Sequence, residues 1–278
     1  MEVSELKNTL QEIADNEYNL LENIDYEELT NEMLAKIGVT DPELRDDLIY
    51  MVMANWIMDD IYNKEELRQI FNICLDEEHL YYKLGEKEDD SVFTRTFSAL
   101  ILAVLYHKDY EDDFLNQQEF QQGAETVIDY YTEEKDLRGY IKGKGWAHSA
   151  AHGADILLEI AKSKKAKKRI LMKLLNAIID KSQIEHHVYF NGEDERIARA
   201  VKSTMKNINL DDETINKWFR DLTDIENFED RNKQDTLIFN LKNILKSLYF
   251  EIISDEVVND KYLILITDAL KELDQKRF

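Results

Sequence analysis

The residues best suited to chemistry lie in one segment of the chain, from Arg138 to Glu159. His148, His152 and Asp155 follow one another there at spacings of four and three residues. An α-helix turns by about 100° per residue, so side chains at these spacings share one face. We therefore predict an amphipathic helix that begins near residue 145, with a polar stripe opposite a face rich in alanine.

Two chemistries suit this stripe. Two histidines four residues apart on a helix can share a metal ion, with Asp155 as a third ligand. Alternatively, a histidine near its ordinary pKa can act as a general acid or base in a small-molecule enzyme of the hydrolase type. Ser149 stands where metalloproteases of the zincin type carry glutamate. One helix also offers too few clustered ligands for a structural metal, so we predict no metal and no cofactor, and leave open whether the chain is an enzyme.

The segment before this stripe is glycine-punctuated and basic. Gly143 and Gly145 flank Lys144, with Lys142 close by. A helix start here would offer free backbone N–H groups to an anion, and nearby aromatic rings could stack on a planar group. The predicted binding site comprises Arg138, Tyr140, Lys144, Trp146, His148, His152 and Asp155, joined by Arg95, Glu193 and Arg196 from neighbouring helix starts.

A purely structural interpretation also fits this segment. Alanine and glycine at this density favour close packing between helices, and histidines on the polar face can simply be hydrated. The basic run over residues 162–169 is typical of a solvated connector, although it could contact an acidic partner or an RNA backbone. We leave these interpretations open at this point.

The composition indicates an all-α protein. The chain has 278 residues, with only 8 Gly and 1 Pro, which is too few for a fold rich in turns. Its formal net charge of −23 argues against general binding to nucleic acid or to an anionic membrane. The single cysteine, Cys74, excludes an intrachain disulfide. No apolar run is long enough to span a membrane and the first ten residues are polar, so we predict a cytoplasmic protein.

Apolar periodicity and capping residues predict about a dozen helices and no strand. The predicted helices cover residues 4–14, 25–37, 41–56, 63–74, 76–84, 91–106, 116–131, the segment from 145, 166–179, 193–208, 211–222, 235–253 and 258–273. Asp90 is predicted to cap the helix over 91–106, and Asn63 with Glu66 forms a capping box. Residues 224–233 are predicted to be a loop.

We predict a single helical domain over residues 1–278. Helical pairs recur roughly every 40 residues, which favours a curved array of antiparallel helical hairpins like HEAT or armadillo repeats. A closed α/α bundle is the alternative. The core should bury Trp56, Phe97, Leu157, Leu174, Trp218 and Leu245.

Four patterns resemble a bacterial family known as domain of unknown function 2785. The longest is Arg138-Gly-Tyr-x-x-x-Lys-Gly-Trp-Ala-His-x-x-Ala-His-Gly-Ala-Asp. The others are Asp90-Ser-Val-Phe-x-Arg-x-Phe-Ser, Gly192-Glu-Asp-x-Arg and Asn243-x-x-x-Ser-Leu-Tyr-Phe. The resemblance implies a soluble, helical, bacterial protein with no established activity. From the predicted helical array, and because no catalytic constellation is complete, we expect a binding scaffold with a polar, anion-binding concave groove around the central helix, and a small anion or a protein as its partner. A small-molecule enzyme is the alternative.

Overall fold

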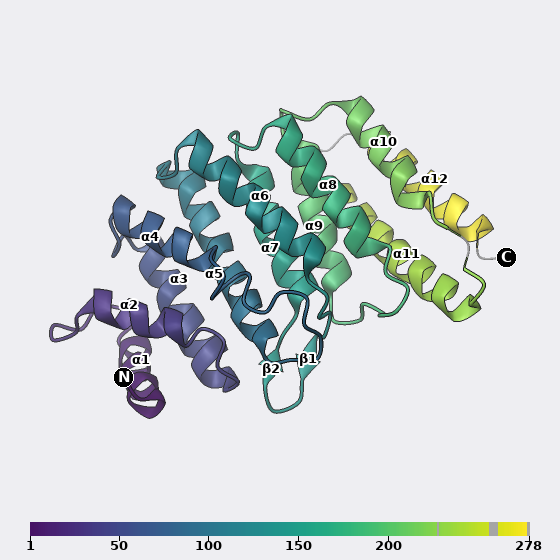
Figure 1. Ribbon diagram of the computed structural model, residues 1–278. Coiled ribbons are helices and arrows are strands. Elements are labelled where there is room, and N and C mark those ends of the chain that lie inside the picture. The colour runs from purple at the N-terminus through teal and green to yellow at the C-terminus, as the bar shows by residue number, and fades with distance from the viewer. Residues whose placement is uncertain (227, 256–260, 277–278) are drawn as a thin grey trace. The chain divides into compact units, whose positions relative to one another are not determined.

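The computed structural model describes residues 1–226, 228–255 and 261–276, and most of these are helical (Figure 1). Their helices are α1 (Val3–Asp15), α2 (Tyr26–Ala35), the π-helix η1 (Glu43–Ile49), α3 (Tyr50–Met58), α4 (Lys64–Cys74), α5 (Ser91–Asp112), α6 (Gln117–Glu133), α7 (Ser149–Lys162), α8 (Lys168–Ser182), α9 (Glu193–Lys206), α10 (Asp212–Thr223), α11 (Arg231–Ile253) and α12 (Lys261–Gln275). Two strands, β1 (Tyr140–Ile141) and β2 (Gly145–Trp146), pair with each other. The predicted all-α class is confirmed, and the expectation of no strand is wrong at this one hairpin.

Local side-chain chemistry explains several helix starts. The Asn63 side chain accepts from the Glu66 backbone N–H, while the Glu66 carboxylate accepts from the Asn63 N–H, so the predicted capping box is confirmed. Asp90 does not cap α5 as predicted. Its neighbour Asp89 accepts the Ser91 N–H at 2.9 Å instead, which leaves the Asp90 carboxylate available for another partner.

Three predicted segments need correction. Residues 76–84 form turns and no helix. The helix predicted from Asp41 begins as the π-helix η1, whose wider turn cannot be seen in apolar periodicity. Helix α11 begins at Arg231, which shortens the loop predicted over 224–233. Residues 227 and 258–260, within that loop and at the start of the last predicted helix, lie outside the described residues.

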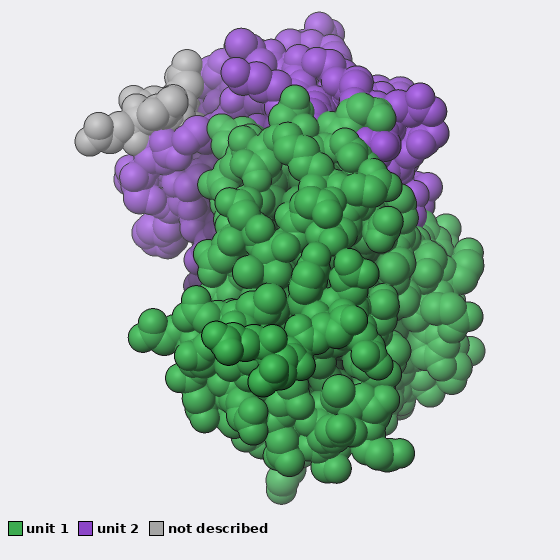
Figure 2. Space-filling model, turned by 90° about the vertical axis from the view of Figure 1, so that its left-hand side faces the viewer, with its two compact units in different colours: residues 1–116, 133–152 green, residues 117–132, 153–278 purple. Residues whose placement is uncertain are grey.

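The chain divides into two compact units, coloured separately in Figure 2. The first contains residues 1–116 and 133–152, and the second contains residues 117–132 and 153–278. In the first unit α3 packs against α1, η1 and α5, and α4 packs against α5. In the second, α11 packs against α8, α9 and α12, and α10 packs against α8 and α12. The single-domain organisation stays a prediction.

Each unit has an apolar core that the sequence pattern located correctly. The six residues predicted as core markers are all buried: Trp56, Phe97, Leu157, Leu174, Trp218 and Leu245. Within the described residues, no helix is both long and apolar enough to cross a membrane.

Gly153 provides a test of packing in the second unit. A Cβ added there would lie 2.3 Å from Cδ2 of Tyr131, far inside van der Waals contact. We expect Gly153→Ala to lower the free energy of unfolding by about 1–3 kcal/mol through overpacking, although alanine favours helix by about 1 kcal/mol. Thermal unfolding followed by circular dichroism measures the change. In a Tyr131→Leu background the added cost should shrink, and an equal cost in both backgrounds would contradict this explanation.

Candidate functional site

The glycine-punctuated segment forms a β-hairpin and not the first turns of a helix. Tyr140 lies opposite Trp146, and Ile141 opposite Gly145. Gly143 and Gly145 have φ angles of +79° and +83°, a left-handed conformation that glycine adopts without strain. The prediction of a helix from about residue 145 is therefore wrong, because these glycines serve the turn.

Helix α7 begins four residues later, at Ser149. The Ser149 hydroxyl donates to the carbonyl of Asp136. Pairing across the hairpin continues up to this point, since the backbone N–H of His148 donates to the Arg138 carbonyl at 2.9 Å. The N–H of Ala147 likewise donates to the Gly139 carbonyl at 3.0 Å. These two N–H groups hold the residues after β2 against the segment that leads into β1.

Five rings form a continuous series in the first unit. Tyr140 packs edge-on against Trp146 with ring centroids 5.2 Å apart, and Trp146 stacks on His148 at 4.8 Å. His148 lies edge-on to His152 at 5.4 Å, and His152 contacts Phe97 at 5.9 Å. Tyr140 is 59% exposed and Trp146 39%, whereas Phe97 is buried. The series therefore runs from the surface into the core, and it contains both histidines of the predicted stripe.

Arg95 supports this arrangement from inside the unit. Its guanidinium is fully buried and forms two hydrogen bonds with the Glu134 carboxylate, at 2.5 and 3.0 Å. It also donates to the Tyr82 carbonyl and the Ser91 hydroxyl, both at 2.9 Å. A side chain enclosed in this way positions its neighbours, and it does not reach solvent. Arg95 therefore holds neighbouring segments together, and its predicted contact with a ligand stays a prediction.

The other two basic residues of the predicted site in this unit are bound to carboxylates. Arg138 donates to both oxygens of Asp136, through contacts of 2.6–3.0 Å, and to the Asp89 carbonyl at 2.8 Å. The hydrogen bonds with Asp136 raise the pKa of the Arg138 guanidinium. Lys144 holds the Asp90 carboxylate at 2.6 and 2.8 Å.

A pocket of about 720 Å³ adjoins these ion pairs. Asp89, Asp90 and Ser91 line it at the start of α5, and residues 34–39 and the turns around residues 78–83 complete its walls. Arg138 and Lys144 thus each contact a lining residue, which places the basic part of the predicted site beside a cavity.

Arg45 and Asp46 of η1 are site residues that the sequence reasoning missed. Arg45 is fully buried, and its Nη2 donates to the Lys144 carbonyl at 2.7 Å. Its guanidinium carbon lies 4.1 Å from the Phe93 ring centroid, a cation–π contact. A Cβ on Gly145 would approach Arg45 Nη2 to 2.8 Å, so only glycine lets the hairpin lie this close to η1. Arg45 lies next to the apolar stripe of its helix in the sequence, and a charged residue at such a position is normally expected to be exposed. The sequence therefore did not indicate that Arg45 is buried.

Asp46 carries a perturbed carboxyl group at the same place. Burial raises its pKa from 3.8 to about 6, although the adjacent Arg45 and a hydrogen bond from the Trp146 backbone act in the opposite direction. Arg45 Nε lies 2.7 Å from Asp46 Oδ1. The side chain is 23% exposed. A carboxyl group with this pKa can take up or release a proton near neutral pH.

The remaining predicted residues belong to the second unit. Asp155 accepts two hydrogen bonds from Nη1 of Arg196, at 2.8 and 2.9 Å. Glu193 is buried and accepts the Asn191 backbone N–H at 2.7 Å, at the start of α9. The structure therefore brings Asp155 and Arg196 together as an ion pair. Among all the residues described, no three His, Cys, Asp or Glu side chains cluster where a metal ion could be held.

Over the described residues, fold and site together define a mostly helical protein with an aromatic, ion-paired β-hairpin. The chain belongs to the family described as protein of unknown function (DUF2785), whose model matches residues 80–250. The resemblance seen in the four sequence patterns is thereby confirmed. No curated protein matches the chain, and no solved structure does. The matched residues include the hairpin, Arg95 and Glu134, whereas Arg45 and Asp46 precede them.

The buried ion pair can be tested against an exposed one. We expect Glu134→Ala to lower the free energy of unfolding by about 3–5 kcal/mol, because it leaves Arg95 charged and buried. Arg196→Ala removes an ion pair whose arginine side chain is 44% exposed, and should cost at most about 1 kcal/mol. Chemical denaturation measures both, with Glu134→Gln as a milder variant should Glu134→Ala fail to fold. Equal, small costs would contradict the supporting role of Arg95.

The raised pKa of Asp46 predicts a pH dependence. An acid whose pKa rises on folding contributes stability that is fully present below its unfolded pKa and lost as the pH rises through its folded value, about 6. The side chain of Asp46→Asn stays neutral at every pH. The free energy of unfolding of this variant, relative to that of the natural chain, should therefore increase as the pH rises from 4.5 to 7.5. The gain should be roughly 1–1.5 kcal/mol, because each pKa unit corresponds to about 1.4 kcal/mol, only part of the shift falls within this pH range, and partial exposure reduces the effect further.

Urea denaturation at several pH values measures this gain. Asp47→Asn is the matched control, because it changes the same charge at an exposed neighbouring position. Its relative stability should vary by less than about 0.5 kcal/mol over the same range. A gain for Asp46→Asn that grows as the pH falls would show that the sign of the pKa change is wrong.

Proposed function

We propose that this protein is a helical binding scaffold that recognises a planar anion at its hairpin. The proposal has an architectural part, a HEAT-like array of helical hairpins, and a chemical part, the ligand site. The bacterial source and the cytoplasmic location stay predictions from the sequence.

Packing within the second unit supports the array. Helices α8, α10 and α12 are successive neighbours, and α9 and α11 pack together (Figure 1). Contacts between every second helix are typical of stacked helical hairpins, where one helix of each pair forms one layer. Consecutive helices also pack together, α8 with α9 and α11 with α12, as the two helices of one hairpin do.

Ion pairs also link neighbouring helices within the layer formed by α8, α10 and α12. Lys168 at the start of α8 contacts Asp211 at the start of α10. Asp212, the next residue, contacts Lys261 at the start of α12 at 2.5 Å. The two contacts join equivalent helix ends, separated by 43 and about 50 residues, a spacing near the period of helical-hairpin repeats. The ion pairs therefore recur along the chain at about the same spacing as the helical pairs.

The exposed ring pair on the hairpin is the observation that carries the ligand proposal. Tyr140 and Trp146 present aromatic surface to solvent, and Trp146 is held from behind by stacking on His148. Lys142 in the turn is exposed and has no acidic partner among the residues that the structure describes. A planar ring bearing a negative charge matches this combination, because it can stack on Trp146 while Lys142 attracts the charge.

Several of the other charged groups of the predicted site are held in ion pairs, which agrees with a binding role. Arg138 and Lys144 hold carboxylates of the protein, and Asp155 holds Arg196. These ion pairs fix the shape of each region, so they serve a rigid surface better than proton transfer. Arg138 and Lys144 would then define the edge of the site rather than bind the anion directly.

One observation favours the alternative of a hydrolase-type enzyme that uses His148, His152 and Asp155. His148 has a φ of +50°, a left-handed conformation that is uncommon for a residue other than glycine. Such strain clusters at active sites, and the Asp46 carboxyl with a pKa of about 6 belongs to the same unit. An enzyme would turn over an aryl ester and lose that activity in His148→Ala, whereas a scaffold would leave the ester intact.

Nuclear magnetic resonance of the indole N–H groups tests the scaffold proposal. Trp56 and Trp218 are buried and donate to the backbone carbonyls of Tyr18 and Leu175, so their signals serve as internal references. We expect benzoate to shift the Trp146 signal saturably, because its ring stacks there. Benzamide should bind more weakly, since it lacks the charge, and acetate should give no shift.

Matched lysine variants complete this test. Lys142→Ala should weaken benzoate binding about three- to five-fold, the effect of losing one exposed charge contact of up to about 1 kcal/mol. Lys164→Ala removes an exposed lysine from the second unit and should leave the affinity unchanged. The proposal is wrong if the Trp146 signal stays still, or if both lysine variants weaken binding equally.

A further inference from the structure

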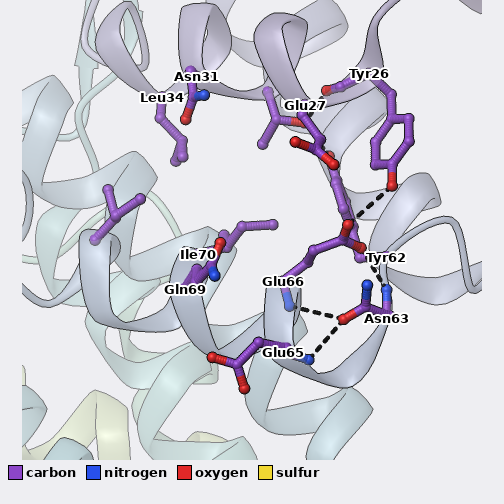
Figure 3. Close-up of a pocket in the computed structure, with 12 residues that line it drawn as sticks. Tyr26, Glu27, Asn31, Leu34, Tyr62, Asn63, Glu65, Glu66, Gln69 and Ile70 are labelled. Atoms are coloured by element: carbon purple, nitrogen blue, oxygen red, sulfur yellow. Dashed lines mark hydrogen bonds between the residues drawn. The ribbon is translucent and has the colours of Figure 1, made fainter.

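A second pocket lies between α2 and α4 in the first unit (Figure 3). Its volume is about 330 Å³, within the range of small-molecule sites. Asn31 and Leu34 of α2 face Glu66 and Ile70 of α4 across the open space. The pocket precedes the residues matched by the family, 80–250, and of its lining residues Leu34 also lines the pocket beside the hairpin ion pairs.

The lining combines an apolar floor with an acidic rim. Leu34, Ile70 and Ile73 supply aliphatic surface. Three carboxylates, those of Glu27, Glu65 and Glu66, also line the space. The lining residues identified in the structure include no lysine, arginine or histidine. The pocket is therefore negatively charged as well as apolar, inside a chain whose formal net charge is already −23.

The three carboxylates are bound to different extents. Glu66 accepts the Tyr26 hydroxyl at 2.9 Å and the Asn63 backbone N–H at 2.7 Å, so its position is set. Glu65 has one loose partner, Arg68, at 3.3 Å, and its side chain is 70% exposed. No residue described in the structure forms a hydrogen bond or an ion pair with the Glu27 side chain. The negative charge of the pocket is thus only partly balanced by the protein.

The walls of the pocket are held in place without a ligand. The Tyr62 hydroxyl and the Thr30 hydroxyl share a buried hydrogen bond of 2.7 Å, which ties α2 to the segment before α4. The capping box of Asn63 and Glu66 fixes the first turn of α4. A preformed cavity loses little conformational entropy when it is filled.

We propose that this pocket binds a small organic cation, a short alkyl chain that ends in an ammonium group. The alkyl chain would cover Leu34, Ile70 and Ile73, which removes apolar surface from water. The ammonium has three donors and no acceptor, so it matches the carboxylates of Glu27 and Glu66. An anion of the same size would meet three carboxylates and no positive lining residue, so the charge decides against it.

Titration with n-butylammonium chloride tests the proposal, followed through the methyl signals of isoleucine and leucine. We expect saturable shifts of Leu34, Ile70 and Ile73. Butanol should bind more weakly, since it has the same alkyl chain without the charge, and butyrate should not bind. Raising the salt concentration from 20 to 200 mM should weaken ammonium binding, because screening shortens the reach of the carboxylates.

A pair of adjacent glutamates provides the matched control. Glu27→Gln should weaken butylammonium binding about three- to five-fold, as expected for one exposed ion pair. Glu28→Gln changes the same charge in the same helical turn, but Glu28 does not line the pocket, so the affinity should stay within about 1.5-fold. Equal weakening by both variants would show that only the net charge of the protein matters for binding, and it would overturn the proposal. Binding of butanol as tight as that of butylammonium would overturn it too.

The source of the ammonium group is decided by one further ligand, N-acetyl-lysine N-methylamide. Affinity equal to that of butylammonium assigns the pocket to a lysine side chain of a protein. Binding of butylammonium alone assigns it to a free amine. Both outcomes keep the ammonium site, and neither depends on anion binding at the hairpin, so this proposal and the proposed function can fail separately.

Discussion

The buried ion pair between Arg95 and Glu134 is the interaction on which the hairpin region depends. Taking two charges out of water is costly, and the cost is recovered only when the geometry is good and the remaining donors are satisfied. Arg95 meets this condition through its bonds to Tyr82 and Ser91. Glu134 also accepts the Asp136 N–H at 2.9 Å, so the pair fixes the chain on which Arg138 and the hairpin follow. Removing either charge would therefore disturb the surface site without touching it.

Residues of different family patterns contact one another in the fold. Phe97 of one pattern meets His152 of the longest pattern, within the first unit. In the second unit the Asp194 carboxylate accepts the Ser247 hydroxyl at 2.6 Å, which joins two further patterns. Many of these residues are thus accounted for by folding, as the structural interpretation of the sequence expected. Some residues of the patterns are exposed, among them Tyr140 and Trp146 on the hairpin and Phe250 at the end of the fourth pattern, and our proposed recognition uses the hairpin pair.

Sequence periodicity predicted most helices, because each has an apolar face that must be buried, and the capping box at Asn63 because its hydrogen bonds are local. It failed where tertiary contacts decide the backbone. The spacing of His148 and His152 suits a helix, yet Gly145 adopts a positive φ and lies against Arg45, which turns the chain into a hairpin. Of the predicted site residues in the first unit, the rings of Tyr140, Trp146, His148 and His152 lie in contact with one another. Asp46 was missed, because its burial depends on contacts that no local pattern contains.

The two proposed sites differ in how they work with the charge of the whole chain. A protein with a formal net charge of −23 attracts cations and repels anions over distances up to the Debye length. The α2–α4 pocket acts with this field, since its carboxylates are only partly balanced. The hairpin acts against it, because carboxylates neutralise Arg138 and Lys144, whereas Lys142 is exposed and has no acidic partner in the described part of the chain. Under the two proposals, stacking on Trp146 would therefore supply much of the affinity for an anion at the hairpin, whereas an alkyl chain beside carboxylates would suffice in the pocket.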